Sequence, residues 1–246
     1  MSSVVAVIPA RWASTRFPGK VLAPIQGMPM IQHVWQRVTK SRLVKDVIVA
    51  CDDQRVLDAA KAFGAKAVMT SAAHESGTDR IAEAIANIPA DIVVNVQGDE
   101  PLIEAKVIDA LVQTLIDDPQ CPMATAIRKI TKEEFLKNPN VVKVVVDDRG
   151  YALYFSRAAI PFNRDQKNFS TIKCYQHLGL YAYRKDFLKK FSQLSVSDLE
   201  KTEKLEQLRV LERGYKIKTV LTDYETVGVD TPEDLERVSE LMRNKV

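Results

Sequence analysis

Cysteine is scarce in this sequence: the chain of 246 residues contains three, at Cys51, Cys121 and Cys174. They are odd in number, far apart and in no CxxC pair, which argues against a disulfide framework and against a cysteine metal site. A large excess of one charge is also absent, because 35 lysines and arginines face 32 aspartates and glutamates. A net charge of +3 is too small to indicate non-specific binding, so no nucleic-acid partner is expected.

Long hydrophobic runs are missing as well. No stretch approaches the roughly 18 uncharged apolar residues that a membrane span needs. The apolar run at the N-terminus stops at Pro9 and Arg11 and follows no basic region, so it is unlike an export signal. We therefore expect a cytoplasmic protein with no membrane partner. The remaining composition, 46% hydrophobic and 27% charged, is typical of a soluble globular protein.

The first half of the chain alternates short β-branched segments with segments of helical periodicity. Residues 3–9 and 46–53, for example, read as apolar strands, and a helix-period segment follows each of them. Strands this apolar, each followed by a helix, predict a parallel sheet that is covered on both faces. The predicted fold class is therefore α/β, with a doubly wound, Rossmann-like sheet.

The second half has a different pattern, which predicts a mixed, antiparallel insertion. Two strands flank a turn at residues 148–150, which indicates a hairpin, and Leu178–Tyr183 predicts a further strand. His177 would lie just before that strand, a position more typical of a structural histidine than of a site residue. Ser197 and Glu200 form a capping-box signature, which predicts one long helix from there to residue 214.

The segment after the first strand, residues 11–20, reads RWASTRFPGK. It matches neither GxGxxG nor GxxxxGK[ST], so the fingerprints of Rossmann dehydrogenases and Walker-type NTPases are absent. It does contain Arg11, Arg16 and Lys20 together with two hydroxyl side chains. Forked guanidiniums and a mobile ammonium in a loop beyond a strand suit a polyphosphate, although a solvated surface loop is the alternative.

Two aspartates are candidate magnesium ligands. Asp99 follows the fourth strand, next to Gly98, which lets a ligand approach the backbone, and Asp230 precedes the last helix. Each has an ordinary structural alternative, because Asp99 suits a turn and Asp230 adjoins the predicted cap at Thr231. Together with the basic loop, the two carboxylates indicate a site for magnesium and a triphosphate.

A third polar segment, Ser76, Gly77 and Thr78, opens a helix. Its hydroxyls and amides would face outward at the positive end of that helix, where an anion can bind. An N-cap with no ligand is an equal alternative. The segment 199–214 is most simply an amphipathic surface helix, and its composition marks no site residue.

Seven segments from residue 9 to residue 238 carry a resemblance to a known family: PARWASTRFPGKVL, SGTDRI, VNVQGDEP, ALYFSRAAIP, HLGLYAYR, LEKTEKLEQLRVLERG and GVDTPEDLERV. They resemble the 3-deoxy-manno-octulosonate (Kdo) cytidylyltransferases, the CMP-Kdo synthetases of lipopolysaccharide assembly. The first and fourth segments are very specific together. The resemblance implies a single nucleotidyltransferase domain over residues 1–246, a homodimer and dependence on magnesium.

The resemblance also implies a task for individual residues. Arg11, Arg16 and Lys20 would hold the phosphates of CTP; Ser76, Gly77 and Thr78 would lie at the cytosine and ribose; Asp99 and Asp230 would bind magnesium. The residues implied around the acidic sugar are Arg80, Gln97, Arg157, His177, Tyr181, Glu206 and Gln207. Residues 1–128 would be mainly the nucleotide-binding half, and residues 129–246 the sugar-binding and dimerisation half.

The implied reaction joins CTP and Kdo to give CMP-Kdo and pyrophosphate. The anomeric hydroxyl of the sugar would attack the α-phosphorus in line, and negative charge would gather on the leaving pyrophosphate. Lys20 and Arg11 are the expected catalytic cations, and magnesium on Asp99 and Asp230 would add to them. Three positions depart from the family pattern beside the expected contacts, and they could tune substrate affinity: Trp12 stands for Tyr, Val21 for Pro and Asp79 for Glu.

Two alternatives stay open. The sugar could be another acidic one, such as 8-amino-Kdo or a sialic acid; the segments HLGLYAYR and LEKTEKLEQLR favour Kdo over sialic acid but do not separate it from the amino analogue. The chain could also be a non-catalytic nucleotide-binding protein on the same scaffold. The presence of both metal-binding aspartates argues against that, because binding alone does not require them.

Overall fold

The structure is a computed structural model that describes residues 2–13, 17–74, 76–165 and 169–244. The chain forms two compact units: residues 1–112 with residues 226–246 make the first, and residues 113–225 make the second. In the part of the chain that is described, no helix is long and apolar enough to cross a membrane.

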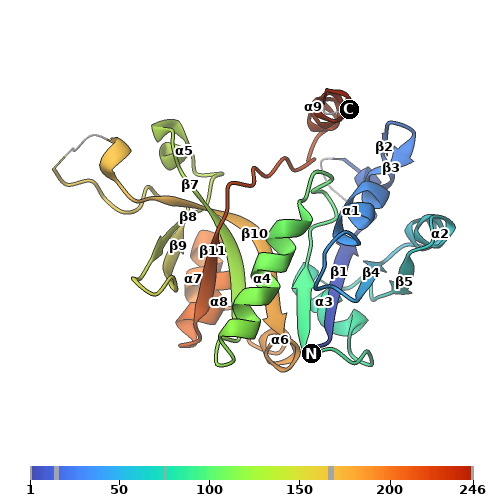
Figure 1. Ribbon diagram of the computed structural model, residues 1–246, viewed down its shortest axis with the longest axis horizontal. Coiled ribbons are helices and arrows are strands. Elements are labelled where there is room, and N and C mark those ends of the chain that lie inside the picture. Colours follow the sequence, from blue (N-terminus) through green and yellow to red (C-terminus); the bar gives the residue numbers. More distant parts are fainter. Residues whose placement is uncertain (1, 14–16, 75, 166–168, 245–246) are drawn as a thin grey trace. The chain divides into compact units, whose positions relative to one another are not determined.

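The first unit is built on four parallel strands, which lie in the order β5, β4, β1, β6 (Figure 1). Their bounds are β1 (Val4–Ala10), β4 (Asp46–Cys51), β5 (Lys66–Met69) and β6 (Ile92–Asn95). The chain adds β4 and β5 on one side of β1 and then places β6 on the other side. Strand order therefore reverses between β1 and β6, the point at which open α/β sheets bind ligands.

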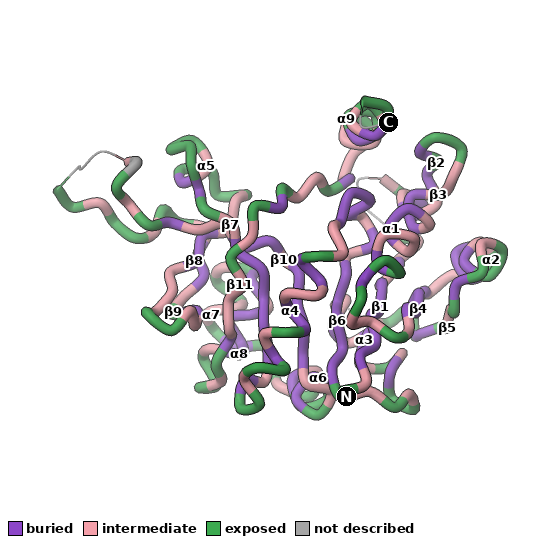
Figure 2. The backbone as a smooth tube through the Cα atoms, in the orientation of Figure 1, coloured by how far each residue is buried: buried purple, intermediate pink, exposed green. Residues whose placement is uncertain are grey.

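Burial of the central strand confirms the predicted sheet. The side chains of β1 alternate between the two faces, yet all of them are buried except Pro9, which is half-buried (Figure 2). Both faces are therefore covered. Helices α1 (Met30–Val38) and α3 (Gly77–Ala84) pack against β1 and β4, and α2 (Gln54–Ala62) packs against β4 and β5. The doubly wound α/β architecture is thus confirmed.

The C-terminal segment completes the first unit. Helix α9 (Pro232–Arg243) packs against β2 (Pro24–Ile25), and Val238 of α9 shares a core with Ile25 and Met30. Thr231 caps α9, and its hydroxyl accepts a hydrogen bond from the backbone of Asp234, as its sequence predicts. The remaining elements that begin in this unit are η1 (Lys20–Leu22), β3 (Met28–Pro29) and α4 (Ala105–Asp117).

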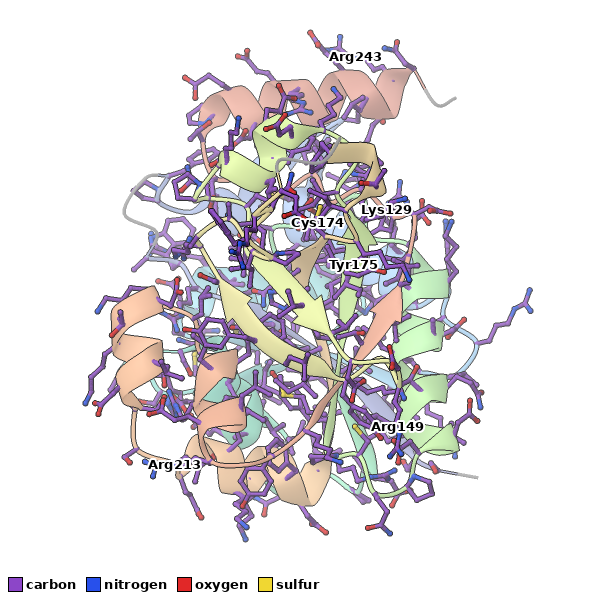
Figure 3. The ribbon with its side chains drawn as sticks, turned by 90° about the vertical axis from the view of Figure 1, so that its left-hand side faces the viewer. Lys129, Arg149, Cys174, Tyr175, Arg213 and Arg243 are labelled. Atoms are coloured by element: carbon purple, nitrogen blue, oxygen red, sulfur yellow. The ribbon has the colours of Figure 1, made fainter. Side chains whose placement is uncertain are left out.

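The second unit has mixed strand directions, which confirms the predicted insertion. Strand β7 lies between β11, which is parallel to it, and β10, which is antiparallel; β8 pairs with β10 and with β9 in antiparallel fashion. Lys129 of β7 and Tyr175 of β10 mark one end of the β7–β10 pair (Figure 3). The bounds are β7 (Met123–Lys129), α5 (Glu133–Lys137), β8 (Lys143–Val146), β9 (Ala152–Ser156), η2 (Phe169–Thr171), β10 (Tyr175–Arg184), α6 (Lys185–Ser192), α7 (Asp198–Glu203), α8 (Gln207–Glu212) and β11 (Ile217–Leu221).

Two sequence-based boundaries in the second unit were wrong. The strand predicted at Leu178–Tyr183 starts at Tyr175, so His177 lies inside β10 rather than before it. Its pairing with β7 shifts register after His177, and Gly179 in this stretch has a positive φ of 68°. The irregular pairing hides the strand's alternation from sequence reasoning.

The long helix predicted from Ser197 to residue 214 is also two helices. The capping box of Ser197 and Glu200 is present as predicted, but α7 ends where Lys204 adopts a left-handed conformation at φ 55°. Helix α8 then begins at Gln207. A lysine at positive φ has no local sequence signal, which is why the break could not be predicted.

Candidate functional site

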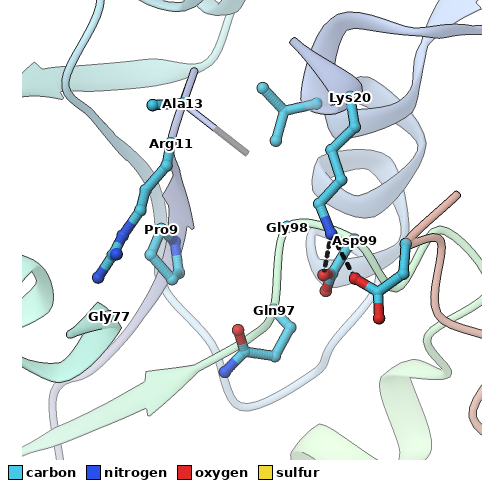
Figure 4. A pocket seen from close by; sticks show the side chains of 10 residues that line it. Pro9, Arg11, Ala13, Lys20, Gly77, Gln97, Gly98 and Asp99 are labelled. Carbon is cyan, nitrogen blue, oxygen red and sulfur yellow. Dashed lines mark hydrogen bonds and ion pairs between the residues drawn. The ribbon is translucent and has the colours of Figure 1, made fainter. Parts of the chain in front are cut away.

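A cavity of about 420 Å³ lies in the first unit, beyond the carboxyl ends of β1 and β6 (Figure 4). This is the place where the strand order reverses, and the volume is within the range of small-molecule sites. The cavity is lined by Pro9, Arg11, Ala13, Lys20, Val21, Gly77, Gln97, Gly98, Asp99 and Asp230. Six of the predicted site residues are therefore brought together at one edge of the sheet.

Lys20 is the charged centre of this cavity. Its Nζ donates to Asp99 Oδ2 at 2.7 Å and to Asp230 Oδ1 at 3.0 Å (Figure 4). It also donates to Val229 O at 2.9 Å. Burial by itself would lower the pKa of Lys20, but the two carboxylates, Asp99 foremost, outweigh it, so the pKa lies above its ordinary value. The lysine is therefore a firmly protonated counter-ion to both aspartates.

Backbone geometry explains why these three side chains converge. At Gly98, a Cβ atom would come within 2.8 Å of the carbonyl oxygen of Pro9, so only glycine lets the loop after β6 approach β1 this closely. The backbone N–H of Val229 donates to Asp99 O at 2.9 Å and thereby holds Asp230 beside Asp99. Two carboxylates from distant parts of the sequence thus meet at one point.

The basic loop is folded by its own residues. Gly19, with φ at 71°, donates its N–H to Trp12 O at 3.0 Å, and the ring of Trp12 fills the space where a Cβ of Gly19 would lie. The guanidinium of Arg55 stacks on the Trp12 ring at 3.5 Å. Arg11 lies across the cavity from Lys20 (Figure 4), and Arg16 lies outside the described residues.

The segment Ser76–Thr78 takes the position that its capping role predicts. Ser76 caps α3, because its Oγ accepts from the N–H of Asp79 at 3.1 Å and donates to the Asp79 carboxylate at 2.8 Å. Gly77 lines the cavity, whereas Thr78 is buried. The contact of this segment with a nucleotide stays a prediction.

Arg80 is not among the residues that line the cavity. Its side chain is fully buried; Nη1 donates to Thr70 Oγ1 at 2.6 Å and Nη2 donates to Asp52 Oδ2 at 3.0 Å. Asp52 Oδ1 in turn accepts from the backbone N–H of Trp12 at 2.9 Å. Asp52, which sequence reasoning missed, therefore links Arg80 to the basic loop. It directly follows β4, so the rule that selected Asp99 could have found it.

In the second unit, three of the residues predicted around the sugar touch one another. Tyr181 OH donates to Gln207 Oε1 at 3.3 Å, and Gln207 Nε2 lies 3.4 Å from His177 Nδ1. His177 Nε2 lies 3.0 Å from the hydroxyl of Thr125. Burial lowers the pKa of His177 to about 3 and raises that of Tyr181 well above its ordinary value, so both are neutral near pH 7. Thr125 had no signal in the sequence.

Arg157 lies in the second unit as well but outside that network. Its Nε donates to Glu203 O at 2.8 Å, its Nη1 donates to Pro139 O at 3.1 Å, and its backbone N–H donates to the Glu203 carboxylate at 2.9 Å. Lys143, fully buried, donates to the carbonyl oxygen of Arg157. The guanidinium is thus fixed by carbonyl oxygens. Glu206, the other residue predicted here, directly precedes α8.

The sequence profile described as cytidylyltransferase matches residues 5–217 of this chain. Two curated relatives are similar over almost their whole length, and both are named 3-deoxy-manno-octulosonate cytidylyltransferase. The protein from Geotalea uraniireducens is 56% identical, over 98% of this chain and 99% of its own. The protein from Geobacter sulfurreducens is 52% identical, over 98% of this chain and 100% of its own.

Two solved structures are also similar. A CMP:2-keto-3-deoxy-manno-octonic acid synthetase complexed with CTP is 47% identical and has a TM-score of 0.95, with 100% of each chain covered. A 4-diphosphocytidyl-2C-methyl-D-erythritol synthase from Anaerococcus prevotii has a TM-score of 0.65 at 13% identity, over 98% of this chain and 99% of its own. The second likeness concerns the fold alone.

Proposed function

The chain belongs to the cytidylyltransferase family, and we propose that it activates Kdo with CTP, giving CMP-Kdo and pyrophosphate for lipopolysaccharide biosynthesis. The observation that carries this proposal is the meeting of Lys20, Asp99 and Asp230 in a cavity at the strand-order reversal. High identity to named Kdo cytidylyltransferases supports the choice of substrates.

The chain's own cations stabilise the negative charge that develops in this reaction. The anomeric hydroxyl of Kdo loses its proton to water and its oxygen attacks the α-phosphorus of CTP; the bond to the bridging oxygen breaks, and pyrophosphate leaves with the added negative charge. Arg11, Arg16 and Lys20 bind the triphosphate and stabilise that charge. Lys20 suits the changing charge best, because an ammonium on a flexible stem can follow the phosphate, whereas Arg11 supplies a forked and more rigid contact.

Magnesium is the proposed cofactor, and the donors present fit it. Asp99 Oδ2, Val229 O and Asp230 Oδ1 all lie within 3.0 Å of one cationic atom, Lys20 Nζ, and oxygen is the donor type that magnesium prefers. We propose that Asp99 and Asp230 hold it. When bound, magnesium neutralises phosphate charge and acidifies a coordinated hydroxyl. Among the residues described, no three His, Cys, Asp or Glu gather as a complete metal site, and magnesium commonly completes its shell with water and substrate phosphates.

The sugar is bound by neutral hydrogen-bonding groups and by arginine. His177, Tyr181 and Gln207 form the neutral set, Glu206 adds a carboxylate acceptor, and Arg157 pairs with the sugar carboxylate. Arg157 supports this role, because its partners Glu203 O and Pro139 O are carbonyls that leave the positive charge available. Gln97, which lines the cavity of the first unit, and Arg80 are the other residues predicted around the sugar; Arg80 is fully buried, so it would act only through neighbours such as Asp52.

A cytoplasmic homodimer is the proposed state of the enzyme. Leu153 of β9 and Phe162 are 60% and 85% exposed, and both are apolar side chains that a second copy of the chain could bury. Light scattering of the purified protein tests the dimer. A mass of one chain at micromolar concentration would contradict it.

The decisive experiment measures pyrophosphate release on mixing the enzyme with CTP, magnesium and one sugar at a time. Kdo is expected to give the highest kcat/KM, and 8-amino-Kdo and a sialic acid serve as the competing substrates. A preference for either competitor would replace Kdo as the substrate. Absence of release with all three, from protein that binds CTP, would favour the non-catalytic alternative.

A further inference from the structure

In the second unit, hydrogen bonds connect Tyr181, Gln207, His177 and Thr125, and we call this set the neutral network. Which atom donates and which accepts at each contact is fixed, starting from Thr125. The hydroxyl of Thr125 donates to the carbonyl oxygen of Leu180 at 2.8 Å. A hydroxyl has one proton to give, and a carbonyl can only accept. At its second contact, 3.0 Å from His177 Nε2, the Thr125 oxygen must therefore act as an acceptor. His177 accordingly carries its proton on Nε2.

The next two contacts follow from that proton. A buried, neutral imidazole has one N–H, so His177 Nδ1 is bare and accepts. The atom of Gln207 facing it at 3.4 Å must then be the amide nitrogen. This turns Gln207 Oε1 toward Tyr181, whose phenol donates to it at 3.3 Å. Each donor in the chain from Tyr181 to Leu180 thus meets an acceptor.

We propose that Thr125 is a positioning residue for the sugar: it fixes the tautomer of His177 and, through it, the orientation of the Gln207 amide. The inference rests on the proposed function, in which Gln207, His177 and Tyr181 contact Kdo. Thr125 is 0% exposed, whereas Gln207, Tyr181 and His177 are 4%, 9% and 8% exposed. Thr125 therefore has no surface for a ligand and acts only through its neighbours.

The fixed orientation selects for hydroxyl groups. Gln207 keeps one N–H that the network does not use. The phenol oxygen of Tyr181 uses its O–H to donate to Gln207 and can still accept a hydrogen bond through its lone pairs. A sugar hydroxyl can accept from the first and donate to the second at the same time. A flipped amide would offer an oxygen instead of the N–H and would leave Tyr181 without an acceptor.

The hydroxyl of Thr125 also satisfies the carbonyl oxygen of Leu180 in β10, so a substitution at position 125 is judged against its effect on the sheet. Thr125 lies in β7, directly opposite Tyr181 of β10 and Thr219 of β11. Valine has nearly the same shape and is also favoured in strands, so Thr125→Val removes the hydroxyl and its bonds to Leu180 O and His177 with little change in side-chain volume. Thr125→Ser keeps the hydroxyl and loses only a methyl group.

The test combines nitrogen NMR of the imidazoles with kinetics. Wild type is expected to show His177 with a protonated Nε2 and a bare Nδ1, assigned by replacing the other two histidines singly with glutamine. Thr125→Val is expected to shift those signals and to raise the KM for Kdo roughly tenfold, the size of one lost buried hydrogen bond, with the KM for CTP unchanged. Thr125→Ser should restore both readouts.

Thr219→Val is the matched control. The hydroxyl of Thr219 also donates to a carbonyl, Gly150 O at 2.8 Å, but has no histidine partner. The Thr219→Val variant should leave the His177 signals and the KM for Kdo unchanged.

Three outcomes would overturn the proposal. A proton on Nδ1 in wild type contradicts the derived direction, whatever the substrate is. A raised KM for Kdo in Gln207→Ala but not in Thr125→Val shows that Gln207 binds sugar without help from Thr125. An unchanged KM for Kdo in both variants, with the His177 signals shifted in Thr125→Val, shows that the network exists but that the sugar pocket lies elsewhere.

Discussion

The charged cluster of the first unit and the neutral cluster of the second differ in kind. In the first unit, Lys20, Asp99 and Asp230 are all charged, and the aspartate side chains are 32% and 45% exposed. In the second unit, the cluster of His177, Gln207, Tyr181 and Thr125 is neutral and nearly buried. The first arrangement holds one cationic group, Lys20 Nζ, between two carboxylates. The second recognises the direction of hydrogen bonds.

This difference leads to separate expectations for catalysis and for recognition. Charged groups that are partly exposed stabilise a charge that appears during the reaction, so their loss should act mainly on kcat. Neutral groups that hold an uncharged part of a ligand act in the ground state as well, so their loss should act mainly on KM.

The largest expected effect is that of removing the cation from the first cluster. Lys20→Ala should lower kcat by on the order of 10²-fold or more, because one preorganised charge on the leaving pyrophosphate is lost. Lys20→Arg should also be poor, since a planar fork does not replace a point charge between two carboxylates. Steady-state kinetics, with the exposed Lys40→Ala as control, measure this. A near wild-type kcat in Lys20→Ala would remove Lys20 from the mechanism.

The second prediction concerns the carboxylates of the same cluster. Asp99→Asn and Asp230→Asn should each lower activity at least about tenfold, because an amide is a weaker ligand for a hard cation. Excess EDTA should abolish turnover of the wild type. Circular dichroism has to match wild type, and the exposed Asp58→Asn on α2 serves as the control. Full activity in either variant would refute a metal site made of both aspartates.

The third prediction turns to the neutral cluster. Gln207→Ala and His177→Ala should raise the KM for Kdo several-fold to tenfold and leave the KM for CTP nearly unchanged, since each removes a partner of a buried hydroxyl. Gln193→Ala, an exposed glutamine of the same unit, is the control. If these variants changed only the KM for CTP, the neutral cluster would not be the sugar pocket.

The smallest expected effect is a pH dependence of stability that comes from the neutral cluster. The pKa of His177 is about 3 in the folded protein and near 6.5 in the unfolded chain. Below pH 6.5 the unfolded chain therefore binds a proton that the folded protein does not, and stability falls on acidification. From pH 8 to pH 6 the loss due to His177 should be roughly 1 kcal/mol.

Urea unfolding of wild type and His177→Gln at pH 8 and pH 6 measures that contribution. It is the difference between the two proteins in how much the free energy of unfolding changes between the two pH values. An equal change in stability for both proteins would show that folding does not lower the pKa of His177.

The same contrast explains what could be predicted from sequence. The first cluster could be predicted from the sequence, because its residues directly follow strands of a parallel sheet. Ligands bind at the edge where such strands end, so that edge is known before the structure is. Asp99 and Lys20 were selected on that basis, and the structure places both in the cavity. Asp52, which directly follows β4, obeys the same rule. The burial of Arg80 against Asp52 depends on packing that no local pattern reveals.

The second cluster was much harder to predict from the sequence. His177 and Tyr181 lie on one strand whose irregular register conceals its start, and Gln207 was expected in the middle of a helix rather than at the start of one. Thr125 is an ordinary strand residue by every sequence criterion. Its importance follows only from the contacts that folding creates.

The left-handed residue between α7 and α8 has one more consequence. In an unbroken helix, residues 203 and 207 would share a face, because they are four positions apart. The turn at Lys204 lets them serve different neighbours: Glu203 holds Ser156 and the backbone of Arg157, while Gln207 joins His177 and Tyr181. Because the two residues belong to separate helices, a substitution that moves α8 need not displace Glu203, and the break costs one lysine in a strained, left-handed conformation.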